Sequence, residues 1–326
     1  MSERSVIEAV RDGMSEMMTA DERIFVLGED VQEGGVFRAT EGFLDKFGPE
    51  RVLDTPLAEA SIVGVAIGAA LNGLRPIAEI QFADFIHPAM DHILSEASRF
   101  RYRSVGEWSC PLVIRTPWGG GIHGALYHSQ SIESIYAHIP GLKVVTPAFP
   151  EDFKGMIKSA IEDPDPVIFL EHKKLYRSIK TEVPDEDYRT PIGPAVVRRE
   201  GEDVTVFAYG LMLHESLTAA ETLAGEGVNA EVVDLRCLRP LDKETILNSA
   251  SKTGKILIVY EDNLTGGFGA EISAIIAQEA FEYLDAPIVR LAGPDIPTMP
   301  YAPPLEHFYM PDAEKIAAAL RELAAY

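Results

Sequence analysis

The stretch LDTPLAEASIVGVAIGAAL, residues 53–71, sets out the fold and the chemistry of this chain. It places one carboxylate, Glu59, at the start of a helix that otherwise consists of small and apolar residues. An apolar surrounding disfavours the charged form of a carboxylate, because burial removes the charge from water. A glutamate kept there is a candidate acid–base group. Taken alone, a glutamate at the start of a helix more often serves only to interact favourably with the helix dipole.

The composition excludes several classes of protein. A chain of 326 residues is long enough for about two domains. Its formal net charge of −22 argues against nucleic acid and against an anionic membrane surface as partners. Its two cysteines, Cys110 and Cys237, form no CxxC pair, so neither a disulfide framework nor a zinc site is indicated.

The N-terminus and the hydropathy favour a reducing, aqueous compartment. The first residues, MSERSVIEAVRDGM, are charged from the start and predict a helix instead of a signal peptide. No apolar run is long enough to span a bilayer. We therefore expect a cytoplasmic protein, or the mature form of a mitochondrial matrix protein, with no membrane partner.

Short apolar runs alternate with helical patterns along the chain, which predicts an α/β fold. In the first half, strands are expected at 24–27, 52–54, 77–80, 112–115, 144–146 and 167–170, with helices over 59–71, 87–103 and 150–161 between them. Strands this short and apolar, separated by helices, favour a parallel sheet covered on both faces. In the second half, strands are expected at 204–208, 230–235, 256–260 and 288–291.

A charged, proline-containing segment separates the two halves. It carries Pro184, Pro191 and Pro194 and interrupts the alternation. We therefore expect a first domain over residues 1–180, a linker over 181–202 and a second domain over 203–326.

Polar and aromatic residues follow three predicted strands of the first domain. Leu57 and Glu59 come after the second strand, Gln81 and Phe85 come after the third, and WGGGIHGALYHSQS, with His128, comes after the fourth. The carboxyl ends of parallel strands are where ligands usually bind. This set could hold a planar nitrogen heterocycle, with Phe85 stacked on it, Gln81 bonded to an edge and Glu59 facing a ring nitrogen.

Each of these residues also has an ordinary structural explanation. Phe82 and Phe85 are spaced like core residues, and the glycines of WGGGIHG could serve only a tight turn. His123 and His128 could form a metal pair, but no third ligand follows at a suitable spacing. For His123 a structural role is the better interpretation, whereas His128 lies among polar neighbours that leave its ring open to substrate.

Longer stretches resemble the β subunit of thiamine-diphosphate-dependent 2-oxo acid dehydrogenases, the pyruvate, branched-chain and acetoin family. The resemblance covers essentially the whole chain. It implies a transketolase-like pyrimidine-binding domain, a transketolase C-terminal-like domain, and an α2β2 heterotetramer that serves a lipoyl acyltransferase core. It rests on LDTPLAEASIVGVAIGAAL, AEIQFADFIHPAMDHILSEASRFRYRS, RTPWGGGIHGALYHSQSIES, GLKVVTPAFPEDFKGMIKSAIEDPDPVIFLEHKKLYRS and VVDLRCLRPLD.

The resemblance implies roles for individual residues. Glu59 matches the glutamate that hydrogen-bonds N1′ of the cofactor's aminopyrimidine, and Leu57, Gln81 and Phe85 match residues that line this ring. An apolar wall suits Glu59 in this task, because water would compete for the N1′ bond. His128 matches the histidine that assists transfer of the acyl group to lipoyl.

The resemblance also implies a structural potassium site, made mostly of backbone carbonyls. Its members would be Leu112, Ala160, Ile161, Asp163 and Asp165. Asp165 stands where many relatives have asparagine, and a bound cation would tolerate the added charge. His87 occupies a position that is usually apolar or aromatic, and we have no functional account of it.

The chain lacks the GDG motif with which thiamine enzymes hold the metal ion of the diphosphate. Anchoring a diphosphate needs cations or a divalent metal. We therefore expect this chain to bind the aminopyrimidine end only, with the diphosphate and Mg²⁺ held by the α subunit.

Other functions are weighed against this one. The run Gly266-Gly267-Phe268-Gly269 suggests a dinucleotide-binding α/β oxidoreductase, but Ile272 stands where the third glycine of the fingerprint belongs. A non-catalytic partner subunit would not need Glu59, Gln81 and His128 together. An acetoin dehydrogenase β subunit stays open, and the sequence leaves the preferred 2-oxo acid, branched-chain or pyruvate, undecided.

Overall fold

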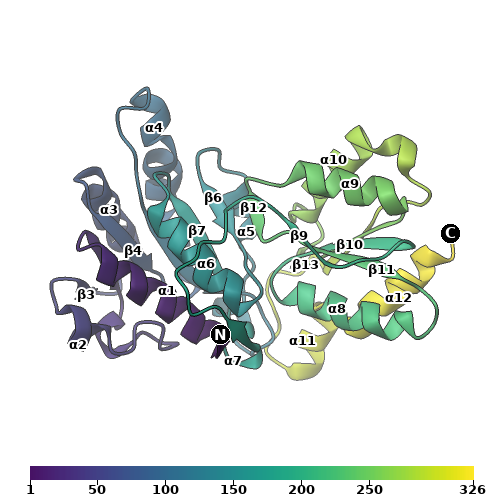
Figure 1. Cartoon of the computed structure of the whole chain (residues 1–326), viewed down its shortest axis with the longest axis horizontal. Helices are drawn as coiled ribbons and strands as arrows, with labels where there is room; N and C mark the ends of the chain where they lie inside the picture. The colour runs from purple at the N-terminus through teal and green to yellow at the C-terminus, as the bar shows by residue number, and fades with distance from the viewer. The chain divides into compact units, whose positions relative to one another are not determined.

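The computed structural model describes all 326 residues and divides into two compact units (Figure 1). Unit 1 comprises residues 1–118 and 135–192, and unit 2 comprises residues 119–134 and 193–326. The change between residues 192 and 193 falls inside the predicted linker. The sequence did not indicate that residues 119–134 belong to the second unit. The domain limits of 1–180 and 203–326 stay a prediction.

Six strands of unit 1 pair in parallel in one sheet, in the order β6-β7-β5-β4-β2-β3. The residues of the four central strands, β7, β5, β4 and β2, are buried almost throughout, as expected for parallel strands covered on both faces. The predicted α/β class is confirmed. The strands are β2 (Ile24–Gly28), β3 (Val52–Asp54), β4 (Arg75–Glu79), β5 (Val113–Trp118), β6 (Lys143–Val145) and β7 (Val167–His172).

Helices cover this sheet. α1 (Val6–Ala20) and α6 (Pro150–Glu162) lie side by side (Figure 1), and Gly13 allows their close approach, because a Cβ there would meet Cγ2 of Ile157 at 2.5 Å. α3 (Glu59–Leu71) packs against β4 and β2. The remaining elements are α2 (Phe43–Phe47), α4 (Phe100–Arg103), α5 (Glu133–Ala137), α7 (Leu175–Ser178) and the antiparallel pair β1 (Ser2–Ser5) and β8 (Lys180–Val183).

The helix predicted over residues 87–103 is not continuous. The structure has a 3-10 turn at His87–Ala89, π geometry at His92–Glu96, a second 3-10 turn at Ala97–Arg99 and then α4. Pro88 lies inside the first turn and lacks the backbone N–H that a regular helix would use. The pattern of apolar residues predicted a helical segment but not these changes of pitch.

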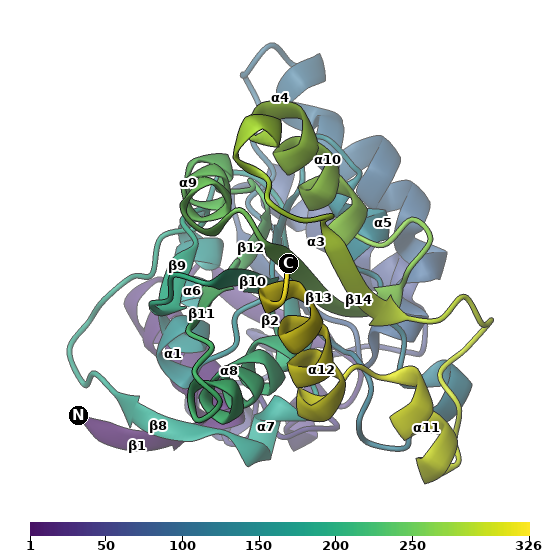
Figure 2. The same cartoon turned by 90° about the vertical axis from the view of Figure 1, so that its right-hand side faces the viewer.

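Unit 2 has a second sheet, in the order β14-β13-β10-β11-β9, with only β9 antiparallel. α8 and α12 lie side by side on one face, and α9 and α10 cover the other (Figure 2). No helix is both long and apolar enough to cross a membrane. The elements are β9 (Val196–Arg199), β10 (Val204–Ala208), α8 (Leu211–Ala224), β11 (Ala230–Asp234), β12 (Cys237–Arg239), α9 (Lys243–Thr253), β13 (Ile256–Asn263), α10 (Gly269–Glu279), β14 (Val289–Gly293), α11 (Pro303–Tyr309) and α12 (Ala313–Ala324).

A buried ion network ties three neighbouring strands of unit 1 together. Arg115 of β5 donates to both carboxylate oxygens of Glu171 on β7, at 2.7 and 2.6 Å, and to the carboxylate of Glu79 on β4. The Tyr176 hydroxyl donates to Glu171 at 2.6 Å. Burial alone would lower the pKa of Arg115, but the charges of Glu171 and Glu79 raise it, so the guanidinium stays charged.

Removing the cation of this network should be costly. Arg115→Met leaves Glu79 and Glu171 buried without their partner, and breaking a buried pair in this way costs about 3–5 kcal/mol. We expect a large drop in the urea midpoint measured by circular dichroism. Arg23→Met, which removes an exposed pair with Asp21, is the control and should stay near wild type. Equal stability of the two variants would contradict this account of the network.

Candidate active site

Glu59 is the first residue of α3 and is half-buried. Ala58 precedes it and has no side chain that could cap the helix. The backbone N–H groups at this end of α3 therefore lack a side-chain acceptor. The helix dipole favours a negative charge there. The structure thus places Glu59 where the sequence predicted it, at the mouth of an apolar helix.

A second carboxylate, that of Glu29, lies close to Glu59 and was not predicted from the sequence. It follows β2 directly and is buried, with Oε1 making no hydrogen bond. Burial raises the pKa of Glu29 to about 7, and the negative charges of Glu59, Asp30 and Glu79 add to the effect. The sequence signal that could have identified Glu29 is its position directly after a fully apolar strand, at the same edge of the sheet as Glu59.

Gln81 joins this acidic group. Its side-chain amide donates to Oδ2 of Asp30 at 3.1 Å and to the backbone carbonyl of Glu29 at 3.5 Å. Gln81 and Glu59 therefore both have Glu29 as a neighbour. These two predicted site residues thus lie on either side of the same buried glutamate, and their role in a shared site stays a prediction.

Phe85 and Leu57 are placed differently. Phe85 lies in a short 3-10 turn, Ala83–Phe85, and its ring packs edge-on against Phe82 at 5.7 Å between centroids. Phe82 in turn contacts Phe37, at 5.5 Å. Leu57, by contrast, has 82% of its surface exposed. A leucine this exposed beside Glu59 is free to be covered by a ligand or another chain.

His128 lies in unit 2, whereas the other predicted catalytic and cofactor-binding residues lie in unit 1. It follows the 3-10 turn Ala125–Tyr127 and is half-buried. The segment that carries it, residues 119–131, begins directly after β5 and is closed by a backbone hydrogen bond from Gly119 to Gln130 at 3.1 Å. We call this segment the His128 loop.

Two acidic groups that follow in unit 2 have raised pKa values. Burial raises the pKa of Glu133 well above its ordinary value, and nearby Asp262 adds to this. The Tyr209 hydroxyl donates to Glu133 at 2.9 Å, which does not offset the loss of water. Burial also raises the pKa of Asp262, although Ser134 donates to it at 2.5 Å. Neither residue was predicted from the sequence.

The residues of the predicted potassium site already have protein partners. The carbonyls of Leu112, Ala160 and Ile161 accept from Val167, Asp163 and Arg75 at 2.9, 3.3 and 2.7 Å; the Asp163 carboxylate pairs with Lys143, and the Asp165 carboxylate pairs with Arg101. The extra charge of Asp165 is thus met by an arginine of the chain itself. Each carbonyl keeps a second lone pair, so a potassium ion here would rest on the backbone oxygens.

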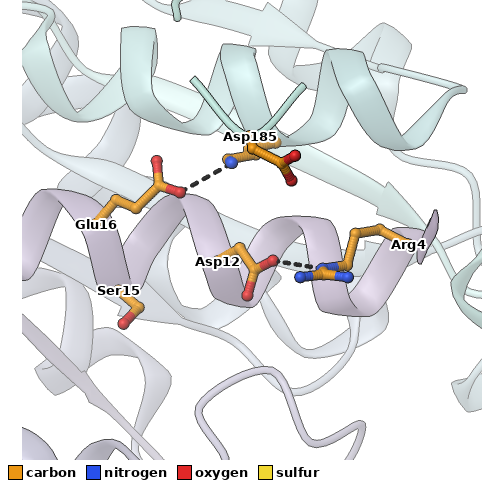
Figure 3. A pocket seen from close by; sticks show the side chains of 6 residues that line it. Arg4, Asp12, Ser15, Glu16 and Asp185 are labelled. Atoms are coloured by element: carbon orange, nitrogen blue, oxygen red, sulfur yellow. Dashed lines mark hydrogen bonds and ion pairs between the residues drawn. The ribbon is translucent and has the colours of Figure 1, made fainter. Parts of the chain in front are cut away.

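A pocket of about 280 Å³ lies elsewhere in unit 1, lined by Arg4, Asp12, Ser15, Glu16, Lys154 and Asp185 (Figure 3). Its charges largely pair with one another: Arg4 meets Asp12 at 2.8 Å, and Lys154 meets Glu16 at 2.8 Å. No predicted site residue lines it. We assign it no function.

The glycine run 266–269 has a packing explanation. A Cβ on Gly267 or Gly269 would meet the ring of Tyr260 at 2.4 or 2.1 Å, so both positions need glycine to let this turn lie against the aromatic ring. The run opens α10. It does not require a bound dinucleotide to explain its composition.

Two family models match most of the chain. The transketolase pyrimidine-binding domain matches residues 2–179, and the transketolase C-terminal domain matches residues 193–316. A solved structure described as a split gene transketolase, inactive beta4 tetramer, superposes with a TM-score of 0.79 at 25% identity over 98% of both chains.

Two curated relatives match from end to end. The 2-oxoisovalerate dehydrogenase subunit beta of Bacillus subtilis (strain 168) is 58% identical over 100% of both chains. The pyruvate dehydrogenase E1 component subunit beta of the same organism is 45% identical, also over 100% of both.

The proximity of Glu29 and Glu59 predicts a measurable coupling. Glu29 should titrate near pH 7 in a carbon-13 NMR titration of labelled glutamate carboxyls, with its signal assigned by Glu29→Gln. In Glu59→Gln its pKa should fall, because a negative neighbour that raises it is gone. Glu22→Gln, at an exposed site, should leave it unchanged. An ordinary pKa for Glu29, or no response to Glu59→Gln, would show that the two carboxylates do not interact.

The same shift has a consequence for stability. The pKa of Glu29 in the folded chain lies above its ordinary value of 4.5, so the folded chain holds an extra proton between about pH 4.5 and 7. The contribution of Glu29 to stability is therefore present below pH 4.5 and is lost as the pH rises through 7.

Proposed function

Because the chain belongs to the family of transketolase-like β subunits of 2-oxo acid dehydrogenases, we propose that it forms half of a thiamine-diphosphate-dependent decarboxylase. This enzyme decarboxylates a 2-oxo acid oxidatively and passes the acyl group to lipoyl. The cofactor of the family is thiamine diphosphate, whose thiazolium supplies the carbon nucleophile and electron sink of the reaction. An α subunit is the expected partner.

The group formed by Glu59, Glu29 and Gln81 carries the proposal. An aminopyrimidine offers ring nitrogens and an amine, which a carboxyl and an amide are suited to bind. The buried Oε1 of Glu29 lacks a hydrogen bond, and Gln81 lies against Asp30, so this end of the sheet is polar and incompletely satisfied. These residues fit the aminopyrimidine end of the cofactor.

In this proposal Glu59 holds a proton against N1′ of the aminopyrimidine. Its half-buried position limits competition from water. Phe85 and Leu57 line the ring, and Gln81 orients it. Closing the site over Leu57 would remove its exposed apolar surface from water.

His128 is proposed to act in a later step. An imidazole near neutral pKa can donate a proton to the opening dithiolane of lipoyl when the acyl group is transferred. Its place in a glycine-rich loop, half-buried, leaves the ring within reach of a substrate. Glu59 and His128 would therefore serve different steps.

The diphosphate and Mg²⁺ are proposed to be held by the α subunit in an α2β2 heterotetramer, which serves a lipoyl acyltransferase core. The missing GDG motif supports this division. The outward face of α3 supports a subunit contact, because Ser61, Val65 and Gly68 are exposed on it and a Cβ on Gly68 would meet nothing. A structural potassium ion at the carbonyls of Leu112, Ala160 and Ile161 remains a further proposal.

The substrate proposed is a branched-chain 2-oxo acid. The 2-oxoisovalerate dehydrogenase relative is 58% identical to this chain, against 45% for the pyruvate dehydrogenase relative from the same organism. Pyruvate is the second candidate, and the acetoin dehydrogenase alternative has no specific observation in its favour. Both family models describe transketolase domains, which argues against the dinucleotide-binding oxidoreductase alternative.

Replacing Glu59 by glutamine should preserve the fold and remove the reaction. Glutamine keeps the volume but cannot share a proton with N1′, so turnover of 2-oxoisovalerate with an artificial electron acceptor should fall about 10²–10⁴-fold in the enzyme reconstituted with its α subunit. Glu22→Gln is the control for loss of one glutamate charge. Activity of Glu59→Gln within a few-fold of wild type would refute the assignment.

Replacing His128 by alanine should separate two steps. Acylation of a lipoyl domain should fall more than decarboxylation measured with the artificial acceptor, because only the acyl transfer needs a proton from this imidazole. Both rates are to be measured on the same reconstituted preparation. Equal losses in the two assays would remove the step-specific role of His128.

A further inference from the structure

The backbone of the His128 loop does not hold its shape unaided. Two non-glycine residues, His123 and Ala125, have φ values of 56° and 58°, in the left-handed region that L-residues rarely adopt. At Gly124 the loop closes tightly on itself, since a Cβ there would meet the His128 carbonyl oxygen at 2.7 Å and the His128 Cβ at 2.9 Å. Strained residues persist only where surrounding contacts fix them.

Glu306, on α11, supplies such contacts. Its Oε1 accepts from the backbone N–H groups of Gly121 and His123, both at 3.1 Å, and its Oε2 meets Nδ1 of His123 at 2.5 Å. The Glu306 side chain is only 5% exposed. A carboxylate accepts but does not donate, so Nδ1 of His123 carries the proton in this contact. One buried carboxylate therefore fixes both the backbone and the side chain of the strained residue.

A second carboxylate fixes the start of the loop. Glu261, in β13, accepts from the Gly120 N–H at 2.6 Å and is almost fully buried. Two methionines leave no room beside it, because a Cβ on Gly120 would meet Met299 at 2.5 Å and Met310 at 3.0 Å. Residues 120, 121 and 123 are thus all held by the two glutamates, ahead of His128.

We propose that Glu306 is a positioning residue: through Gly121 and His123 it fixes the His128 loop, and with it the imidazole of His128, for acyl transfer to lipoyl. This inference rests on the role proposed above for His128. Proton transfer requires donor and acceptor within hydrogen-bond reach, and misplacement by about 1 Å can cost on the order of a hundredfold in rate. Freed from Glu306, His123 would relax toward ordinary φ values and move the loop.

The test uses the enzyme reconstituted with its α subunit and a lipoyl domain. Glu306→Ala should raise hydrogen exchange in the peptide that contains residues 119–131, and should lower lipoyl acylation about tenfold or more relative to decarboxylation with an artificial acceptor. Glu215→Gln is the matched control, since Glu215 also accepts a backbone N–H in unit 2, from Ala313 at 3.0 Å, but is not bonded to the loop. It should change neither quantity.

A pair of variants at His123 keeps the test decisive if Glu306→Ala does not fold. His123→Val removes the donor and disfavours the left-handed backbone, so it should reproduce the selective loss. His123→Asn keeps a donor and tolerates that backbone, so its ratio of the two rates should stay within about threefold of wild type.

Three results would overturn the proposal in distinguishable ways. If His128→Ala lowers the ratio of lipoyl acylation to decarboxylation but Glu306→Ala and His123→Val do not, Glu306 does not position the imidazole. If His128→Ala itself leaves the ratio unchanged, the proposed role of His128 fails, and the positioning role fails with it. Increased exchange without a changed ratio would reduce Glu306 to a purely structural contact.

Discussion

The balance of charge at the carboxyl edge of the unit 1 sheet is the constraint on which the rest depends. Arg115 is a buried cation there, and it pairs with Glu171 and Glu79. Glu29 and Glu59 form no ion pair, and the pKa of Glu29 rises to about 7 because of burial and of the negative charges of Glu59, Asp30 and Glu79. Glu79 and Glu171, which pair with Arg115, link neighbouring strands of the sheet. The unpaired carboxylates, Glu29 and Glu59, belong to the proposed cofactor site.

Unit 2 uses buried carboxylates in a different way. Glu261 and Glu306 accept backbone N–H groups and so fix a loop that its own sequence would not fix. Burial raises the pKa of Glu133, which accepts from the Tyr209 hydroxyl. A buried carboxylate without hydrogen bonds is energetically unfavourable. Each hydrogen bond from the loop to Glu261 or Glu306 therefore both stabilises the buried carboxylate and constrains the loop.

Much of the fold followed from the sequence, because short apolar runs are a strong indication of buried parallel strands. The limits of α3 and of β10 were predicted exactly as the structure has them, and the positions of Glu59 and Gln81 followed from the strand ends. Glu29 was missed, since nothing in the local pattern says that its carboxyl is buried beside Glu59. The pitch changes after His87 depend on packing that the spacing of apolar residues does not encode.

The contacts of the His128 loop lay furthest from prediction. Glu306 is separated from Gly121 by 185 positions, and no local spacing connects them. The left-handed backbone of His123 was equally invisible, because histidine does not mark such a turn as glycine does. Long-range hydrogen bonds of this kind appear only in the folded chain, even though the family resemblance had already assigned a role to His128.

The central claim is that this chain supplies only the aminopyrimidine half of a cofactor site. Isothermal calorimetry with thiamine diphosphate and Mg²⁺ tests it most directly, on this chain alone, on the α subunit alone and on the two together. The account predicts that the chain alone binds more weakly than about 1 μM, equivalent to about −8 kcal/mol, and that the reconstituted enzyme binds more tightly than either subunit. Micromolar or tighter binding to the isolated chain would contradict it.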